Sequence, residues 1–115
     1  MMNFTNIIYM AREFTDANFK EEVLGSSEPV FVDFWAPWCG PCRMMGPVVD
    51  NLAHELDGKG VKIGKVNVDD NPSVAQQYNI MSIPTFAVFK DGKVVVQTAG
   101  GQTIDQLKEM IAKAK

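Results

Sequence analysis

The chain has 115 residues, and its 46% hydrophobic content is enough for a single domain with one core. Its 11 basic and 14 acidic residues give a net charge of −3 without a basic run, which argues against nucleic acid or an anionic membrane surface as a partner. No apolar stretch approaches the roughly 20 residues of a membrane-spanning helix, so proteins or small molecules remain as partners.

The first predicted elements are a short strand at residues 7–10 and a helix that follows it. Thr15 is a suitable N-cap for this helix. Phe14 and Phe19 occupy the two positions of a hydrophobic staple. We expect the helix to end near Gly25.

A nearly unbroken apolar run at residues 30–35 is typical of a strand that is covered on both faces in a parallel sheet. A helix is predicted from about Cys39 to Leu56, because apolar residues recur there at helical spacing. Residues 61–68 are the next predicted strand, and residues 72–78 form a short helix.

The last predicted elements are two strands and a helix. The two-residue loop Asp91-Gly92 favours a type I′ turn, which pairs residues 85–90 antiparallel with residues 93–98. Thr103 caps a final amphipathic helix. The predicted fold is α/β in the order βαβαβαββα, with a mixed five-stranded sheet flanked by four helices, and we expect residues 1–115 to form one domain.

Two cysteines, Cys39 and Cys42, enclose Gly40 and Pro41 between the apolar run and the long helix, a context typical of a redox pair. Residues at i and i+3 lie close enough for a disulfide. A helix N-terminus favours the thiolate, which is the attacking species in thiol–disulfide exchange. The pattern therefore predicts a thiol–disulfide oxidoreductase.

Helical geometry assigns different roles to the two sulfurs. At about 100° per residue, Cys42 lies roughly 60° and Cys39 about 120° from the apolar stripe of the helix. We therefore expect Cys39 to face outward and attack, and Cys42 to be sheltered and resolve the mixed disulfide.

A structural bridge and a metal site are the alternatives to redox chemistry at the two cysteines. A bridge that only stabilises the fold would close a four-residue loop, which is worth roughly 2 kcal/mol and links nothing distant. A zinc or iron site needs about four ligands, and only the two cysteines and His54 are present. With no disulfide framework joining distant segments, we expect a reducing compartment, the cytoplasm.

Asp33 interrupts the apolar run just before the dithiol. Burial would raise the pKa of this carboxyl group and suit it to exchange a proton with a nearby thiol. Lys65 shares the strand parity of Val61 and Ile63 and is expected to point inward as well. Our hypothesis is that Asp33, tuned by Lys65, takes the proton of Cys42; the alternative is an Asp hydrogen-bonded within its strand.

The octapeptide Trp-Ala-Pro-Trp-Cys-Gly-Pro-Cys at residues 35–42 resembles the active-site motif of the thioredoxin family. The resemblance covers about residues 5 to 115 and extends to Val32-Asp33-Phe34, residues 65–69, Ile83-Pro84-Thr85 and the Asp91-Gly92 hairpin. It implies the thioredoxin fold, with Cys39 attacking, Cys42 resolving, Asp33 as the buried acid and Lys65 as its neighbour.

The resemblance also implies a cis peptide bond before Pro84, which the residues alone would leave as an ordinary edge proline. In thioredoxins the proline loop and the dithiol form a shallow apolar surface, on which the backbone of Ile83 pairs with an extended substrate. Matched by position, this substrate surface consists of Trp38, Gly40, Pro41, Ile83, Pro84 and Gly100.

As partners, the resemblance implies disulfide-containing client proteins and a thioredoxin reductase that passes electrons from NADPH, with no cofactor bound to the chain itself. We expect a monomer. An oxidase or isomerase on the same fold is disfavoured, because Gly40-Pro41 lacks a histidine that would make the disulfide more oxidising. A binding module without redox chemistry remains the alternative.

Overall fold

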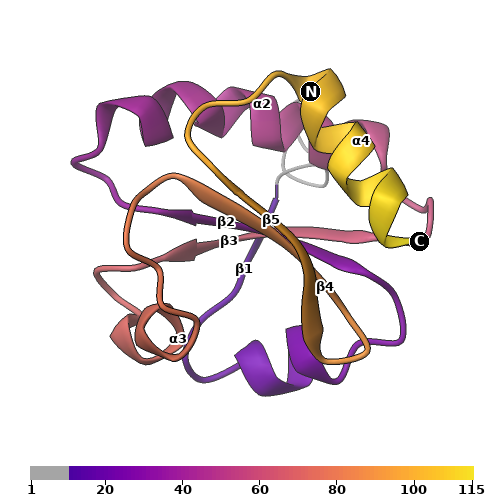
Figure 1. Ribbon diagram of the computed structural model, residues 1–115, viewed down its shortest axis with the longest axis horizontal. Coiled ribbons are helices and arrows are strands. Elements are labelled where there is room, and N and C mark those ends of the chain that lie inside the picture. Colours follow the sequence, from indigo (N-terminus) through magenta and orange to yellow (C-terminus); the bar gives the residue numbers. More distant parts are fainter. Residues whose placement is uncertain (1–10) are drawn as a thin grey trace, which may run out of the picture.

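The computed structural model describes residues 11–115, so the strand predicted at residues 7–10 lies outside the described part of the chain. Within that part, five strands form one mixed sheet in the order β1-β3-β2-β4-β5. Helices cover both faces of the sheet (Figure 1).

The elements follow the predicted order, with the short helix η1 counted among the helices. They are β1 Arg12–Glu13, η1 Lys20–Leu24, β2 Val30–Trp35, α2 Gly40–Glu55, β3 Lys62–Asn67, α3 Pro72–Gln77, β4 Thr85–Lys90, β5 Lys93–Ala99 and α4 Ile104–Ala114. Among the helices of residues 11–115, none combines the length and apolar character needed to cross a membrane.

The helix before β2 begins later than predicted: the N-cap of η1 is Phe19, which has no side-chain cap hydrogen bond, so Thr15 is not its N-cap. Thr15 instead supports the turn that precedes the helix, and the predicted contact between Phe14 and Phe19 is present. The hydroxyl oxygen of Thr15 accepts the N–H of Asn18 at 3.2 Å. The rings of Phe14 and Phe19 meet edge to face with centroids 6.5 Å apart. The helix that follows, η1, is of the π type, with i→i+5 hydrogen bonding, which apolar periodicity does not distinguish from an ordinary α-helix.

Strand β2 lies at the centre of the sheet, parallel to β3 and antiparallel to β4. Strands β4 and β5 form the predicted hairpin, and both loop residues have positive φ, 52° at Asp91 and 79° at Gly92. A type I′ turn requires this conformation, so the local residues explain the pairing.

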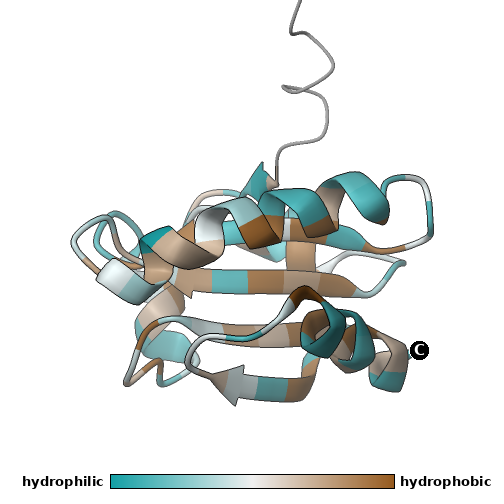
Figure 2. Ribbon diagram, turned by 90° about the horizontal axis from the view of Figure 1, so that it is seen from above, coloured by the Kyte–Doolittle hydropathy of each residue, from teal (hydrophilic) through white to brown (hydrophobic). Residues whose placement is uncertain are grey.

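The sheet has two differently covered faces. Helices α2 and α4 lie over one face, and η1 and α3 lie over the other (Figure 1); we call these the α2/α4 face and the η1/α3 face. In Figure 2 the strands are largely hydrophobic, whereas α2 and α4 alternate between hydrophobic and hydrophilic residues, as expected for helices with one side on a core.

Strand β2 contributes to both faces by alternation. Val30, Val32 and Phe34 belong to the apolar cluster of the η1/α3 face. Phe31 belongs to the cluster beneath α2 and α4. Successive side chains of a strand point to opposite faces, so Asp33 lies with Phe31 on the α2/α4 face. The carboxyl group thus lies beneath the helix that begins beside the dithiol.

Candidate active site

Cys39 and Cys42 are joined by a disulfide at the N-terminus of α2. Their Cα atoms lie 5.2 Å apart, which is within the range that a disulfide bridges. Gly40 and Pro41 are the first helical residues, where the missing N–H of a proline leaves no helical bond unmade. The predicted closure of the pair is confirmed.

Cys39 is the N-cap of α2. Its backbone is extended, with φ −86° and ψ 114°, and its sulfur accepts the N–H of Cys42 at 3.2 Å. An N-cap side chain receives otherwise unpaired amide donors at the positive end of the helix dipole. When the disulfide is reduced, this position favours the thiolate of Cys39.

The expectation that Cys39 faces outward is wrong for this disulfide form. Cys39 retains 6% of its exposure and Cys42 retains 2%, so both are buried, with Cys39 the less so. Two physical reasons account for the difference. A cap residue does not follow the 100° helical wheel, and the carbonyl oxygen of Ile83 lies 3.9 Å from the Cys39 sulfur.

The loop before β4 lies against the dithiol through Ile83. The Ile83–Pro84 peptide bond is cis, as the resemblance implied. The carbonyl of Pro84 accepts the N–H of Gly100 at 2.8 Å. Gly100 has φ 89°, which a residue with a side chain rarely adopts. This loop therefore contacts Cys39 through Ile83 and Gly100 through Pro84.

Trp38 is 68% exposed, as expected for a residue of the substrate surface that the resemblance implied. Its indole N–H donates to a carboxylate oxygen of Asp69 at 2.9 Å, a contact that sequence reasoning missed. A hollow of about 190 Å³ beside it is lined by Trp38, Val68, Ile80, Met81, Ser82 and Ile83. Exposed apolar side chains thus gather next to the dithiol.

Asp33 is 1% exposed, and its Oδ1 atom has no hydrogen-bond partner among the described residues. Desolvation by burial raises the pKa of Asp33 to about 7, although the Lys65 charge opposes this and the Asp50 charge supports it. A carboxyl group with a pKa near neutrality exchanges protons readily with a thiol. The raised pKa agrees with the hypothesis drawn from the sequence.

Lys65 lies opposite Asp33 in the register of β2 and β3, as its parity predicted. Its ammonium nitrogen, however, forms an ion pair with Oδ1 of Asp50 at 3.3 Å. The expected meeting of Asp33 and Lys65 charges is thus corrected: the lysine is a neighbour of Asp33, and Asp50 on α2 is its ion-pair partner. Asp50 follows Cys42 by eight residues, about two helical turns, and this spacing alone does not predict the ion pair.

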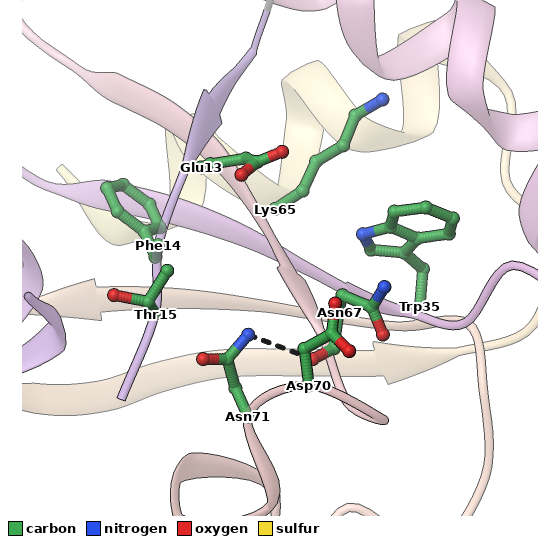
Figure 3. A pocket seen from close by; sticks show the side chains of 8 residues that line it. All are labelled: Glu13, Phe14, Thr15, Trp35, Lys65, Asn67, Asp70 and Asn71. Atoms are coloured by element: carbon green, nitrogen blue, oxygen red, sulfur yellow. Dashed lines mark hydrogen bonds between the residues drawn. The ribbon is translucent and has the colours of Figure 1, made fainter. Parts of the chain in front are cut away.

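A polar hollow of about 140 Å³ lies beside Lys65, lined by Glu13, Phe14, Thr15, Trp35, Lys65, Asn67, Asp70 and Asn71. Figure 3 shows the Lys65 ammonium pointing away from Asn67, Asp70 and Asn71. The side-chain amide of Asn71 donates to the carbonyl of Asn67 at 3.1 Å, so this end of the hollow holds β3 against α3.

Within residues 11–115, no group of three or more His, Cys, Asp or Glu side chains is placed to hold a metal ion. His54, considered from the sequence as a ligand, lies in the last turn of α2.

The Thioredoxin family model matches residues 10–113 of the chain. The chain is 60% identical over 91 residues to Thioredoxin 1 of Synechococcus elongatus, covering 79% of this chain and 84% of that protein. It is 52% identical over 103 residues to Thioredoxin 1 of Nostoc sp., covering 90% and 95%. It is 48% identical over 105 residues to a thioredoxin of Rickettsia felis, covering 91% and 99%. With its thioredoxin fold and its Cys39–Cys42 disulfide, the chain belongs to the thioredoxin family of thiol–disulfide oxidoreductases.

Proposed function

We propose that the chain reduces disulfides in client proteins, with Cys39 as the nucleophile and Cys42 as the resolving thiol. The observation that carries this assignment is the position of Cys39 as the N-cap of α2, where its sulfur accepts the N–H of Cys42. Cys39 is also the more exposed of the two cysteines. The backbone amides favour a thiolate at the sulfur that a client reaches first.

The exchange proceeds in two displacements. The Cys39 thiolate attacks one sulfur of the client disulfide and releases the other as a thiolate. The Cys42 thiolate then attacks the Cys39 sulfur of this mixed disulfide and releases the second client sulfur. Two electrons pass to the client, and Cys39 and Cys42 end as the disulfide.

Asp33 accepts the proton of Cys42 in the second displacement. It lies buried on the face covered by α2, the helix whose first turn carries Cys42. The pKa of Asp33, raised to about 7, makes its carboxylate a matched base for a thiol at neutral pH. Lys65 opposes that rise in pKa and so keeps a share of Asp33 ionised.

Clients dock as extended segments beside the dithiol. Pairing with the backbone of Ile83 would bring a client sulfur close to Cys39, because the Ile83 carbonyl already lies 3.9 Å from the Cys39 sulfur. The proposed docking residues are Trp38, Gly40, Pro41, Ile83, Pro84 and Gly100. Backbone pairing and a shallow apolar surface demand few particular side chains, which supports a broad range of clients.

Membership of the family implies two general classes of partner, disulfide-containing clients and a reductase, and thioredoxins bind no cofactor of their own. We further propose that the reductase is NADPH-dependent and that the chain acts as a monomeric domain of residues 1–115. A cytoplasmic location follows from the same reasoning, because a dithiol of this kind must be kept reduced.

A trapping experiment tests the assignment of the two sulfurs. Cys42→Ser is expected to accumulate a stable mixed disulfide between Cys39 and insulin, because the resolving thiol is gone; non-reducing electrophoresis and mass spectrometry detect it. The matched variant Cys39→Ser is expected to trap little. Equal trapping by both variants would show that the two cysteines do not have the proposed separate roles.

The proposed electron donor has its own test. If a thioredoxin reductase and NADPH do not support insulin reduction by the chain, that donor is excluded.

A further inference from the structure

The charges beneath the dithiol are paired in an unexpected way. Asp33 and Lys65 lie opposite each other on neighbouring strands, yet the Lys65 ammonium is 3.3 Å from Asp50. Oδ1 of Asp33 has no hydrogen-bond partner among the described residues. A lysine beside a buried carboxylate would ordinarily pair with it and hold it ionised. Another group must therefore draw the Lys65 ammonium away from Asp33.

Asp50 is well placed to hold the Lys65 ammonium in this position. Its carboxylate accepts the backbone N–H of Ala11 at 3.2 Å in addition to the ion pair with Lys65. It also belongs to α2, the helix that carries Cys42 about two turns earlier. The same helix therefore carries both the Asp50 carboxylate and the resolving cysteine.

We propose that Asp50 is a positioning residue, which holds the Lys65 ammonium away from Asp33 and so leaves the Asp33 carboxyl group free to take the proton of Cys42. This inference rests on the proposed role of Asp33. Asp50 does not touch the reacting sulfurs. It acts through the lysine and through its own negative charge, which also raises the pKa of Asp33 and makes the Asp33 carboxylate a stronger base.

Other titratable groups of residues 11–115 also lie around this cluster. Glu13 of β1 is opposite Lys65 in the register and is exposed. Asp70 lines the polar hollow next to Lys65. His54 lies one helical turn beyond Asp50. From β4, the residue opposite Asp33 is the apolar Phe86. Asp50 is the carboxylate that forms the ion pair with Lys65.

Removal of the Asp50 charge has two effects of the same sign. Asp50→Asn removes a negative charge near Asp33, and it frees the Lys65 ammonium to approach the Asp33 carboxylate. Both changes favour ionised Asp33, so we expect the pKa of Asp33 to fall by about one pH unit. Asp33 is then a weaker base, and resolution of the mixed disulfide slows.

The test is a carboxyl ¹³C NMR titration of Asp33 in the oxidised full chain. We expect Asp50→Asn to lower the pKa of Asp33, Lys65→Met to raise it, and Asp50→Glu to leave it near the original value. In the Lys65→Met background, Asp50→Asn is expected to have a smaller effect, because only its direct charge remains. Asp91→Asn in the β4–β5 hairpin removes the same charge at the far end of β4 and is the control.

Two results would overturn the role of Asp50: an unchanged or higher pKa of Asp33 in Asp50→Asn, or an equal fall with and without the Lys65 amine. The pH profile of insulin reduction separates this failure from that of the proposed function. If the pKa of Asp33 falls and the acid limb of the profile moves with it, both proposals stand. If the pKa falls and the profile stays, Asp50 positions Lys65 but Asp33 is not the proton acceptor.

Discussion

The two faces of the sheet differ in what they bury. On the η1/α3 face, aromatic rings pack without interruption: Phe89 meets Phe19 at 5.4 Å and Tyr78 at 5.1 Å, each edge to face or nearly so. The α2/α4 face is equally apolar around Phe31, but towards the end of β2 that leads to the dithiol it carries Asp33, with Lys65 opposite.

Because of this difference, one side of β2 contributes mainly to stability, and the other side carries the carboxyl group proposed to act in the reaction. Val32 and Phe34 pack on the η1/α3 face, and Asp33 between them faces α2. Burial of a carboxyl group without a full set of partners costs stability, whereas burial of an aromatic ring provides it. Changes on the η1/α3 face should therefore alter the free energy of unfolding, and changes at Asp33 should alter its dependence on pH.

The largest loss of stability is expected from Phe89→Ala on the η1/α3 face. Phe89 is buried and contacts two aromatic rings, so its removal leaves a cavity and should lower the free energy of unfolding by about 3–5 kcal/mol. Urea unfolding measures the loss, and Val95→Ala on the exposed surface of β5 is the control. A loss below about 1 kcal/mol would contradict the structural role of this face.

Asp33→Asn is expected to give the next largest effect, and one that depends on pH. The pKa of Asp33 is about 7 in the folded chain and near 3.8 in the unfolded chain, so the folded state holds the proton more tightly. The stability that this group contributes is complete below pH 4 and is lost as the pH rises to 7, a fall of roughly 4 kcal/mol.

The variant cannot titrate and lacks this fall, so its free energy of unfolding should exceed that of the original chain increasingly from pH 4 to pH 8. Urea unfolding at several pH values measures the difference. Insulin reduction by the variant should be slower near neutral pH, because Cys42 has lost its proton acceptor. A pH-independent difference in stability would show that Asp33 titrates at its ordinary pKa.

Gly64→Ala should break the η1/α3 face by overpacking rather than by a cavity. A Cβ atom at Gly64 would lie 2.3 Å from a ring carbon of Phe14, so the ring or β3 must shift. We expect the free energy of unfolding to fall by about 1–3 kcal/mol. The pH dependence due to Asp33 should remain, since Gly64 lies on the other face; its loss would show that the faces are coupled.

Local chemistry explains how much of this arrangement was predictable. The Asp91-Gly92 turn and the apolar run at residues 30–35 specify the hairpin and the central strand without reference to the rest of the chain. Strand parity also placed Asp33 and Lys65 on one face correctly. The cis bond before Pro84 came from the family resemblance, because the residues alone favour the trans isomer.

The remaining features depend on contacts between distant segments. The ion pair of Asp50 with Lys65 is set by where α2 crosses β3, which periodicity within α2 does not specify. Cys39 is buried because it caps the helix and because Ile83, 44 residues away in the chain, lies against it. A helical wheel takes account of neither the capping position nor the contact with Ile83. It therefore predicted that the Cys39 sulfur would be more exposed than it is.

The smallest change in stability is expected at the exposed rim beyond both faces, where Trp38 donates to Asp69. Asp69→Ala removes the acceptor at an exposed site and should lower the free energy of unfolding by less than about 1 kcal/mol.

Asp69→Ala should nevertheless reduce kcat/KM for insulin a few-fold, because the indole ring beside the dithiol is then free to turn. Trp38→Phe keeps an aromatic ring but lacks the N–H, and should give a similar reduction. If the hydrogen bond is the cause, the double variant is no worse than either single one; additive losses would mean that Asp69 and Trp38 affect the client separately.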